Sequence, residues 1–520
     1  MTGRGAIALL VALAAGPAPV GAQASVAERI VSTRHAITVS GRRLTYTARA
    51  GRLPIRVNET GEAYGYVFFV AYTLDRSPGQ PVRPLTMLWN GGPGANSALV
   101  HLVGFGPRRI VARRSKAGNA GEYAIEDNAS TWLDATDLVF VDPVGTGYAR
   151  LARTEYAAEF YGTLGDIAAV AEFVRTYLTH FNAWDAPLFV GGERFGVWRA
   201  AGVAEMLERR GIPVAGEILI SGGIPALAAV PYAMKAALFL PTRTAAALYH
   251  HRLSDQLQRD PSATLRLAAT WARDEYAPAL ARSESLSVAQ RAAVVAQLSR
   301  LSGLDTTLID HETLIVKRGD FGRQLLHNRH LVLGRFDSRL TFPADVGGEY
   351  TAGSSRDPLV VRYLQVELRY KTDLAYLGSE AGYRPVTDTG ATLPGERWAW
   401  DQNQPPKDTS AVARAAPAAA AIARRLADDG PPNGAEPWLR RTLEIDPSLQ
   451  AFVAVGLYDS LNSCAWNDYL VGSLDAATRG NIAAHCYAGG HMMYEDGGTR
   501  IQLHQEVAAF IRNAAAASRA

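Results

Sequence analysis

The chemistry that this sequence could perform centres on residues 192–196, which read Gly-Glu-Arg-Phe-Gly. An apolar segment, residues 187–192, leads into this turn, and a helical pattern follows it at once. This is the layout of a strand–turn–helix nucleophile turn, in which small residues flank a strained central residue that attacks a carbonyl carbon. The central residue here is Arg194, whose guanidinium donates hydrogen bonds, accepts none and stays protonated. The sequence therefore predicts the scaffold of a hydrolase without its usual attacking atom.

Two further residues complete the order that such chemistry needs. Asp459 follows a predicted strand at residues 452–457, and His491 follows the next one, at residues 481–487. Nucleophile, acid and histidine, in this order along the chain and each at a strand end, are the order of an α/β-hydrolase triad. A lone aspartate or histidine at such a place is usually a turn residue. The three positions together predict a triad with His491 as general base, Asp459 as its orienting partner and Arg194 at the nucleophile position.

The elements that must position these residues alternate between strands and helices. Residues 29–39 and 42–50 alternate apolar and polar side chains around Gly41, which predicts an N-terminal β-hairpin. Further strands are expected at residues 65–74, 84–89, 137–142, 187–192 and 217–221, and helices at residues 166–178, with Asp166 as N-cap, and 196–210. This alternation predicts a central, mostly parallel sheet whose carboxyl edge gathers the loops at 90–94, at 142–147 and after 192.

The alternation lapses between residues 225 and 446, where we expect an inserted, mainly helical cap. Segments 264–276 and 288–301 look helical, and the second begins with the capping-box spacing Ser287-x-x-Gln290. An alanine-rich run at 411–423 is helical or of low complexity. The predicted hydrolase core thus consists of two parts, residues 25–224 and 447–520.

Residues 1–24 resemble a secretory signal peptide. Arg4 provides the positive start, residues 6–15 the apolar segment, and Ala22-Gln23-Ala24 the small-residue cleavage site. No later run reaches the roughly 18 apolar residues of a membrane span, so we expect export to the periplasm or beyond the cell, with an uncleaved N-terminal anchor as the alternative. The 53 Lys and Arg against 50 Asp and Glu indicate neither a nucleic-acid partner nor an anionic membrane surface.

Two cysteines, Cys464 and Cys486, are the whole cysteine content. In an exported chain an even number permits one disulfide, and two buried thiols are the alternative. The pairs His250-His251 and His311-Glu312 lack the second histidine at i+4 of a helical zinc site, so we expect no metal and no cofactor. Nothing in the sequence sets the oligomeric state.

Several motifs resemble those of the serine carboxypeptidase family in its bacterial form. The segment Trp-Asn-Gly-Gly-Pro-Gly-Ala-Asn-Ser at 89–97 looks like the family's oxyanion and carboxylate-binding loop, and Val-Asp-Pro-Val-Gly-Thr-Gly at 141–147 like a second loop. The turn at 192–196 matches Gly-Glu-Ser-Tyr-Gly except at the serine and the tyrosine, and residues 490–492 match Gly-His-Met. The resemblance covers nearly all of the chain after the signal, the cap least.

This resemblance implies removal of C-terminal residues from peptides through an acyl-enzyme. Asn90 and Glu193 fall where the family grips the substrate's C-terminal carboxylate. Two carboxyl groups in contact must share a proton, which would favour acid pH. Gly92 and Phe195 fall at the oxyanion hole, where backbone N–H groups bind the developing negative oxygen, so phenylalanine in place of tyrosine should matter little.

Arg194 opposes this activity, because it has no nucleophilic atom and its charge disfavours a histidine that must become positive. Ser97, Ser221 and Ser460 do not lie on the turn. We therefore expect an exported carboxypeptidase-like hydrolase whose activity is impaired or lost. The alternatives are a non-catalytic protein that binds carboxylates or peptides, an esterase or acyltransferase on the same scaffold, and a recent or erroneous single-codon change in an active lineage.

Overall fold

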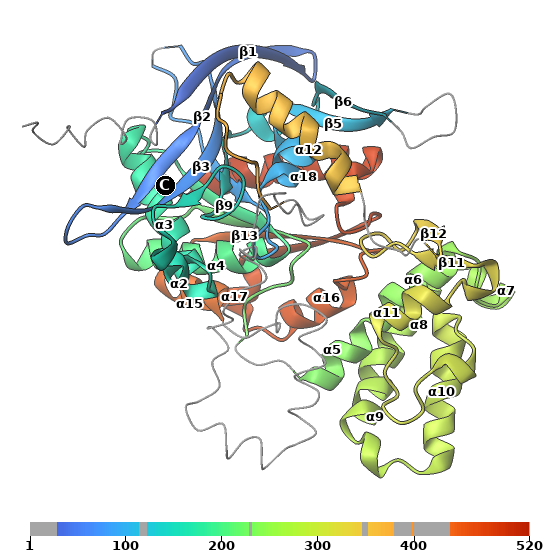
Figure 1. The fold of residues 1–520 in the computed structure, drawn as a ribbon. Helices are drawn as coiled ribbons and strands as arrows, with labels where there is room; N and C mark the ends of the chain where they lie inside the picture. Colours follow the sequence, from blue (N-terminus) through green and yellow to red (C-terminus); the bar gives the residue numbers. More distant parts are fainter. Residues whose placement is uncertain are drawn as a thin grey trace, which may run out of the picture.

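The computed structural model describes residues 29–77, 79–113, 122–227, 231–345, 352–378, 398 and 437–518. A ten-stranded sheet runs through it in the order β1-β2-β3-β7-β4-β9-β10-β13-β14, with β8 paired to β3 (Figure 1). The strands from β7 to β14 in this order are all parallel, whereas β1, β2 and β3 are antiparallel. The predicted α/β class with a mostly parallel sheet is confirmed.

The N-terminal hairpin is also as predicted. β1 (Val31–Val39) pairs with β2 (Arg42–Arg56), and Val39 lies opposite Arg42. Ser40 and Gly41 between them both have positive φ, at 48° and 76°, as a tight two-residue hairpin turn requires. The second strand continues into β3 (Ala63–Leu74), which joins the hairpin to the parallel strands.

The parallel strands are short, and all but β14 are buried on both faces, because they are apolar at nearly every position. These parallel strands are β4 (Leu85–Trp89), β7 (Asp137–Asp142), β9 (Leu188–Glu193), β10 (Gly216–Ile220), β13 (Gln450–Gly456) and β14 (Ile482–Tyr487). β14 lies at the edge of the sheet and is partly exposed. Trp89 lies opposite Gly192, and Ile220 lies opposite Glu193. Neighbouring strands therefore end at the same edge, where the predicted site residues follow them.

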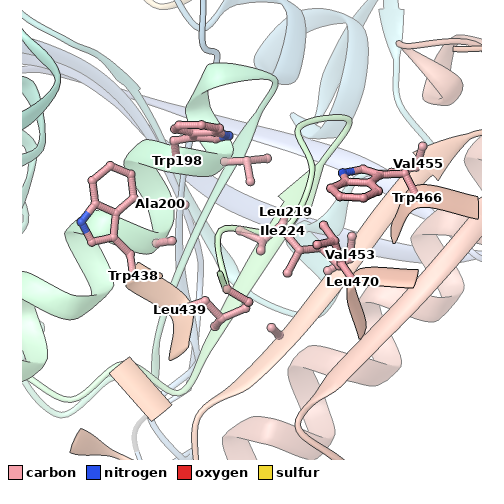
Figure 2. Close-up of a cluster of buried hydrophobic side chains, with 14 of the residues drawn as sticks. Trp198, Ala200, Leu219, Ile224, Trp438, Leu439, Val453, Val455, Trp466 and Leu470 are labelled. Carbon is pink, nitrogen blue, oxygen red and sulfur yellow. The ribbon is translucent and has the colours of Figure 1, made fainter. Parts of the chain in front are cut away.

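Helices cover both faces of the sheet. Alternate side chains of the strands pack on one face with α3 (Thr163–His180), α4 (Phe195–Arg209) and α15 (Trp438–Ile445). Figure 2 shows part of this core, in which Trp198 and Trp438 lie side by side with ring centroids 6.3 Å apart. The other side chains pack with α18 (Gly497–Ala517) and the π-helical η2 (Leu99–Phe105).

Asp166 is not the N-cap that the sequence suggested. α3 begins at Thr163 after Gly162, and Asp166 is buried within the first turn. Its carboxylate pairs with Arg199 of α4 at 2.6 Å instead of capping the helix. The pattern of one helix could not reveal this, because the partner is on another helix.

Between β10 and β13 the described chain is mainly helical. In Figure 1 the helices from α5 to α11 lie together to one side of the sheet. They are α5 (Tyr232–Leu238), α6 (Leu240–Tyr249), α7 (Asp255–Gln258), α8 (Pro261–Trp271), α9 (Ala277–Ala281), α10 (Val288–Ser302) and α11 (Arg318–Gln324). Ser287 and Gln290 form the predicted capping box at the start of α10. The predicted boundaries of the insertion, residues 225 and 446, stay predictions. Helix α15 lies inside this predicted range, yet it packs on α4 in the core.

The remaining elements are short. They are β5 (Arg108–Arg113), β6 (Glu122–Asp127), β8 (Arg150–Leu151), α2 (Ala157–Phe160), β11 (Leu331–Leu333), β12 (Thr341–Pro343), α12 (Ala352–Arg362), α16 (Cys464–Gly472) and α17 (Ala476–Gly480). The antiparallel pair β5–β6 was not predicted. In the part of the chain that the structure describes, every helix is too short or too polar to cross a membrane. The predicted signal at 1–24 and the alanine-rich run at 411–423 lie outside the described residues.

Candidate active site

The turn at 192–196 has the predicted shape. β9 ends at Glu193, α4 begins at Phe195, and Arg194 between them has φ 58° and ψ −122°. A Cβ atom added to Gly192 would lie 2.2 Å from the carbonyl oxygen of Gly196, so only glycine fits there. The indole N–H of Trp89 donates to that same oxygen at 2.8 Å. The backbone thus holds residue 194 in a strained position that a nucleophile turn requires.

The loop after β4 lies directly against this turn. A Cβ atom on Gly91 would come within 2.4 Å of the backbone nitrogen of Phe195. Gly92 has φ 96°, a conformation that favours glycine. The two segments that carry the predicted oxyanion-hole residues, Gly92 and Phe195, are therefore neighbours.

His491 and Asp459 meet as the chain order predicted. The Nδ1–H of His491 donates to Oδ2 of Asp459 at 2.9 Å, and both side chains are buried. Asp459 also accepts from the backbone N–H of Leu461 and the side-chain amide of Asn462, both at 2.8 Å. A carboxylate held in this way fixes the ring and the tautomer of the histidine.

Two groups far away in the sequence hold the histidine turn in place. The hydroxyl of Ser221 donates to the carbonyl oxygen of His491 at 2.7 Å, and the N–H of His491 donates to the carbonyl oxygen of Phe336 at 2.6 Å. The Phe336 ring lies 5.3 Å from the imidazole, and the guanidinium of Arg194 lies over the same ring at 5.9 Å. Phe336 therefore contacts both the histidine and the turn.

The charges around His491 act in opposite directions on its pKa. Burial by itself lowers the pKa of the imidazole, but the charge and hydrogen bond of Asp459, helped by Glu193, outweigh it and raise the pKa above its usual value. Arg194 opposes this rise. The sequence-based expectation that the arginine charge disfavours the imidazolium thus has a counterpart in the structure.

The other ring nitrogen of His491 faces no hydroxyl of the described residues. Nε2 is buried and has no hydrogen-bond partner in the described residues; a carboxylate oxygen of Glu193 lies 4.0 Å away. The three other serines considered from the sequence use their hydroxyls elsewhere. Ser97, Ser221 and Ser460 donate to the carbonyl oxygens of Val141, His491 and Arg335. None of the three is placed as a substitute for the missing nucleophile.

Glu193 is held from two sides. One of its oxygens accepts from the side-chain amide of Asn90 at 2.7 Å and from the hydroxyl of Tyr494 at 2.8 Å. The amide oxygen of Asn90 in turn accepts from the backbone N–H of Val100. Tyr494 was not predicted, although it follows His491 by three residues, within the same turn. Phe336 was also missed, and no motif around it could have indicated its place.

A buried ion pair between α3 and α4 holds the loop that carries Asn90. Arg199 of α4 pairs with Asp166 at 2.6 Å and donates to the carbonyl oxygen of Asn90 at 2.7 Å. Its guanidinium also lies over the Phe195 ring at 5.3 Å. One side chain therefore ties α3, α4 and the loop after β4 together.

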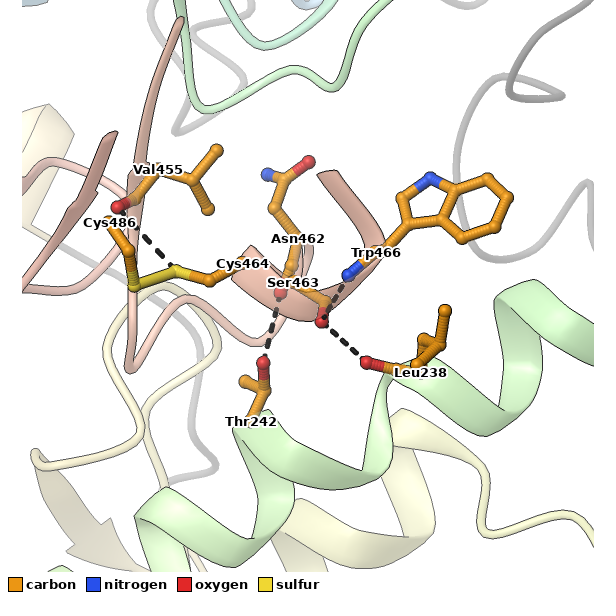
Figure 3. Close-up of a disulfide and its surroundings, with 8 residues drawn as sticks. All are labelled: Leu238, Thr242, Val455, Asn462, Ser463, Cys464, Trp466 and Cys486. Carbon is orange, nitrogen blue, oxygen red and sulfur yellow. Dashed lines mark hydrogen bonds between the residues drawn. A yellow bond between two sulfur atoms is a disulfide. The ribbon is translucent and has the colours of Figure 1, made fainter. Parts of the chain in front are cut away.

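Cys464 and Cys486 form a disulfide, with Cα atoms 5.6 Å apart (Figure 3). The disulfide links α16 to β14. Both cysteines lie between Asp459 and His491 in the sequence. Close by, the hydroxyl of Ser463 donates to the carbonyl oxygen of Leu238, which fastens the insertion to the Asp459 loop (Figure 3). Within the described ranges no three His, Cys, Asp or Glu side chains cluster in a way that could hold a metal.

Comparisons with known proteins relate part of this chain to one family of enzymes. Residues 45–200 match the model of the serine carboxypeptidase family. The pheromone-processing carboxypeptidase KEX1 of Saccharomyces cerevisiae is 34% identical over 104 residues, which are 19% of this chain and 13% of that protein. The serine-type carboxypeptidase F of Aspergillus niger is 29% identical over 148 residues, 28% of this chain and 24% of that protein. The matches thus span a quarter or less of these relatives.

The fold extends further than the sequence match. The crystal structure of the prohormone-processing carboxypeptidase KEX1(Δ)p from Saccharomyces cerevisiae superimposes with a TM-score of 0.52, covering 90% of this chain and 91% of that chain at 13% identity. The predicted α/β-hydrolase fold is confirmed by this likeness and by the mostly parallel sheet.

Proposed function

Because this chain belongs to the serine carboxypeptidase family, we propose that its site binds the C-terminal end of a peptide and that Arg194 blocks the hydrolysis of that peptide. The observation that carries the proposal is the buried pair His491–Asp459 beside Glu193, with no hydroxyl on Nε2 among the described residues. The base and its partner are in place, and the attacking atom is not.

Asn90 and Glu193 bind the C-terminal carboxylate of the substrate. Their side chains already share a hydrogen bond at the carboxyl edge of the sheet, and Tyr494 donates to the same Glu193 oxygen. A substrate carboxylate can approach Glu193 only when one proton is shared between them, since two negative charges in contact repel. Binding is therefore favoured at acid pH.

With a serine at position 194, the remaining groups perform acyl transfer. Nε2 of His491 takes the hydroxyl proton while the oxygen attacks the carbonyl carbon of the last peptide bond. The backbone N–H groups of Gly92 and Phe195 bind the negative oxygen, and the proton then passes to the departing amino acid. Arginine cannot form the acyl-enzyme, so only the binding steps remain.

The second candidate is a protein whose role is binding itself. The observation that favours it is Arg194, which follows Glu193 directly in the turn and whose guanidinium lies 5.9 Å from the centre of the Phe336 ring. A guanidinium can clamp a carboxylate with two parallel hydrogen bonds. An esterase or acyltransferase on the same scaffold is a third possibility, and it needs the same nucleophile.

The sequence pattern at 1–24 supports export of the protein to the periplasm or beyond the cell.

The test compares the unmodified protein with Arg194→Ser on N-blocked dipeptides and on the matching esters from pH 4 to 8. We expect no measurable turnover by the unmodified protein and a gain of at least about 10²-fold in Arg194→Ser, since a nucleophile typically contributes more than this. The controls are Arg194→Ala and Arg194→Ser with His491→Ala, which should stay inactive. Equal turnover by the unmodified protein and Arg194→Ser would contradict the proposal, and peptide binding without turnover in either would favour the second candidate.

A further inference from the structure

Tyr494 lies three residues after His491, in the 3₁₀ turn η12 (Met493–Glu495), and its side chain is fully buried. Its ring meets the Phe105 ring edge-on, with ring centroids 5.0 Å apart. A Cβ atom added to Gly104 would lie 3.6 Å from the Tyr494 ring, so the ring also lies against the backbone of η2. Packing against η2 therefore fixes where the phenol hydroxyl lies, independently of the nucleophile turn.

The hydroxyl of Tyr494 affects how Glu193 uses its two carboxyl oxygens. Oε2 accepts from this hydroxyl at 2.8 Å and from the side-chain amide of Asn90 at 2.7 Å. Oε1 lies on the side of His491, 4.0 Å from its Nε2. A carboxylate oxygen offers roughly two lone-pair sites, so a proton added to Oε2 would have to displace one of the two donors. Oε1 is therefore the oxygen of Glu193 that takes up a proton.

Several charged or titratable groups lie around Glu193, which is itself buried. A hydroxyl that donates to a carboxylate stabilises the ionised form, so Tyr494 favours ionised Glu193. Arg194, which follows Glu193 in the turn, acts in the same direction, and so does His491 when it is protonated, whereas burial opposes ionisation. In contact with His491 and Asn90 lie further charged groups: Asp459, and Arg199 with its partner Asp166. Removing the Tyr494 hydroxyl changes one of these influences and leaves the charges in place.

We propose that Tyr494 is a positioning residue of the carboxylate site, which holds Oε2 of Glu193 so that Oε1 meets the incoming carboxylate. By favouring ionised Glu193, Tyr494 also restricts peptide binding to acid pH, where a proton from the solvent is shared between Oε1 and the substrate. This inference rests on the proposed function, to which it adds the residue that sets the pH range of binding. It does not depend on Arg194, so the unmodified protein is suitable for the test.

The test uses Tyr494→Phe, which removes the hydroxyl and keeps the ring. Binding of an N-acetylated dipeptide with a free C-terminus is titrated calorimetrically from pH 4 to 8, and the C-terminal amide of the same dipeptide measures binding without the carboxylate. We expect the pH at which the affinity falls to half its acid value to rise by at least about one unit in Tyr494→Phe, because a hydrogen bond to a charged group typically favours the ionised form about tenfold or more.

Two controls separate this role from a purely structural one. Tyr276→Phe removes another buried phenol hydroxyl, which donates to the carbonyl oxygen of Leu314 in the insertion, and it should leave the pH profile unchanged. In Glu193→Gln, whose amide cannot ionise, adding Tyr494→Phe should not shift the profile. Binding that Tyr494→Phe weakens equally at every pH would show a loss of packing alone and would overturn the inference.

Infrared difference spectra separate failure of this inference from failure of the proposed function, because they record the protonation of Glu193 without any peptide. The protonated-carboxyl band that is missing in Glu193→Gln belongs to Glu193, and we expect it to persist to higher pH in Tyr494→Phe than in the unmodified protein. Peptide binding with the same pH midpoint in both proteins would overturn the inference and leave the proposed function standing. A shifted infrared band without peptide binding would support the hold of Tyr494 on Glu193 and overturn the proposed function, and neither response would overturn both.

Discussion

At the scale of the residue, the backbone at position 194 is independent of the side chain that it carries. The positive φ of Arg194 follows from the short passage between β9 and α4 and from the close contacts of Gly192 and Gly196. Such a conformation costs free energy for any residue other than glycine, and backbone strain of this kind is typical of active sites. The turn remains here with an arginine in it, and this is why we expect one substitution to restore a nucleophile.

The titration of His491 should respond to that substitution. The positive charge of Arg194 opposes the pKa rise that Asp459 causes, so Arg194→Ser should raise the pKa of His491 further. Because the base is active when neutral, the activity of that variant should fall as pH drops through this pKa. NMR of the imidazole protons measures the shift. Arg194→Lys, which keeps the charge, should titrate like the unmodified protein, and an unchanged pKa in Arg194→Ser would refute the electrostatic account.

At the scale of the element, the Asp166–Arg199 pair decides how α3 and α4 meet below the site. Both side chains are almost fully buried, and Arg199 also holds the carbonyl oxygen of Asn90. Asp166→Ala would leave a buried guanidinium without its counter-charge, which typically costs about 3–5 kcal/mol. Urea unfolding measures the loss. Asp274→Ala, at the exposed pair Arg273–Asp274, should cause no measurable change, and an equally small effect of Asp166→Ala would show that the buried pair is dispensable.

The disulfide acts on two elements, α16 and β14. Cys464 and Cys486 are 22 residues apart, so closing this loop stabilises the fold by on the order of 3 kcal/mol in the chain-entropy model. We expect both cysteines to resist alkylation until a reductant is added, as mass spectrometry would show. The double variant Cys464→Ala with Cys486→Ala should unfold at lower urea and be insensitive to reductant. Free thiols in the purified protein would disprove the bridge.

At the scale of the whole molecule, one buried carboxyl links stability to pH. Glu217 lies in β10 in the middle of the sheet, fully buried, with neither carboxyl oxygen hydrogen-bonded in the described residues. Burial raises the pKa of Glu217 to about 8, so the folded state keeps a proton that the unfolded chain loses near pH 4.5. The protonated Glu217 therefore contributes its full stabilisation of the folded state below pH 4.5, and this contribution is lost as pH rises through 8.

The predicted loss is large enough to measure by urea unfolding at pH 5, 7 and 9. A shift from 4.5 to about 8 corresponds to on the order of 4 kcal/mol across this range, at about 1.4 kcal/mol per pKa unit. Glu217→Gln cannot ionise, so its stability should fall less between pH 5 and 9 than that of the unmodified protein. Parallel pH profiles of the two proteins would rule out this role for Glu217.

Several features of this protein are encoded in short segments of its sequence and could be predicted from them. Apolar runs predicted the strands, and the glycines at 192 and 196 predicted the nucleophile turn. The order of positions 194, 459 and 491 predicted which residues lie near one another, because parallel strands end at one edge of the sheet. The sequence also shows directly that an arginine stands at the nucleophile position.

The contacts between side chains far apart in the chain became known only from the folded structure. Three pairs of residues join separate elements in this way: Phe336 and His491, Asp166 and Arg199, and Arg335 and Ser460. Such partners leave no local pattern, because burial and charge pairing depend on how the elements pack and not on the spacing within one of them.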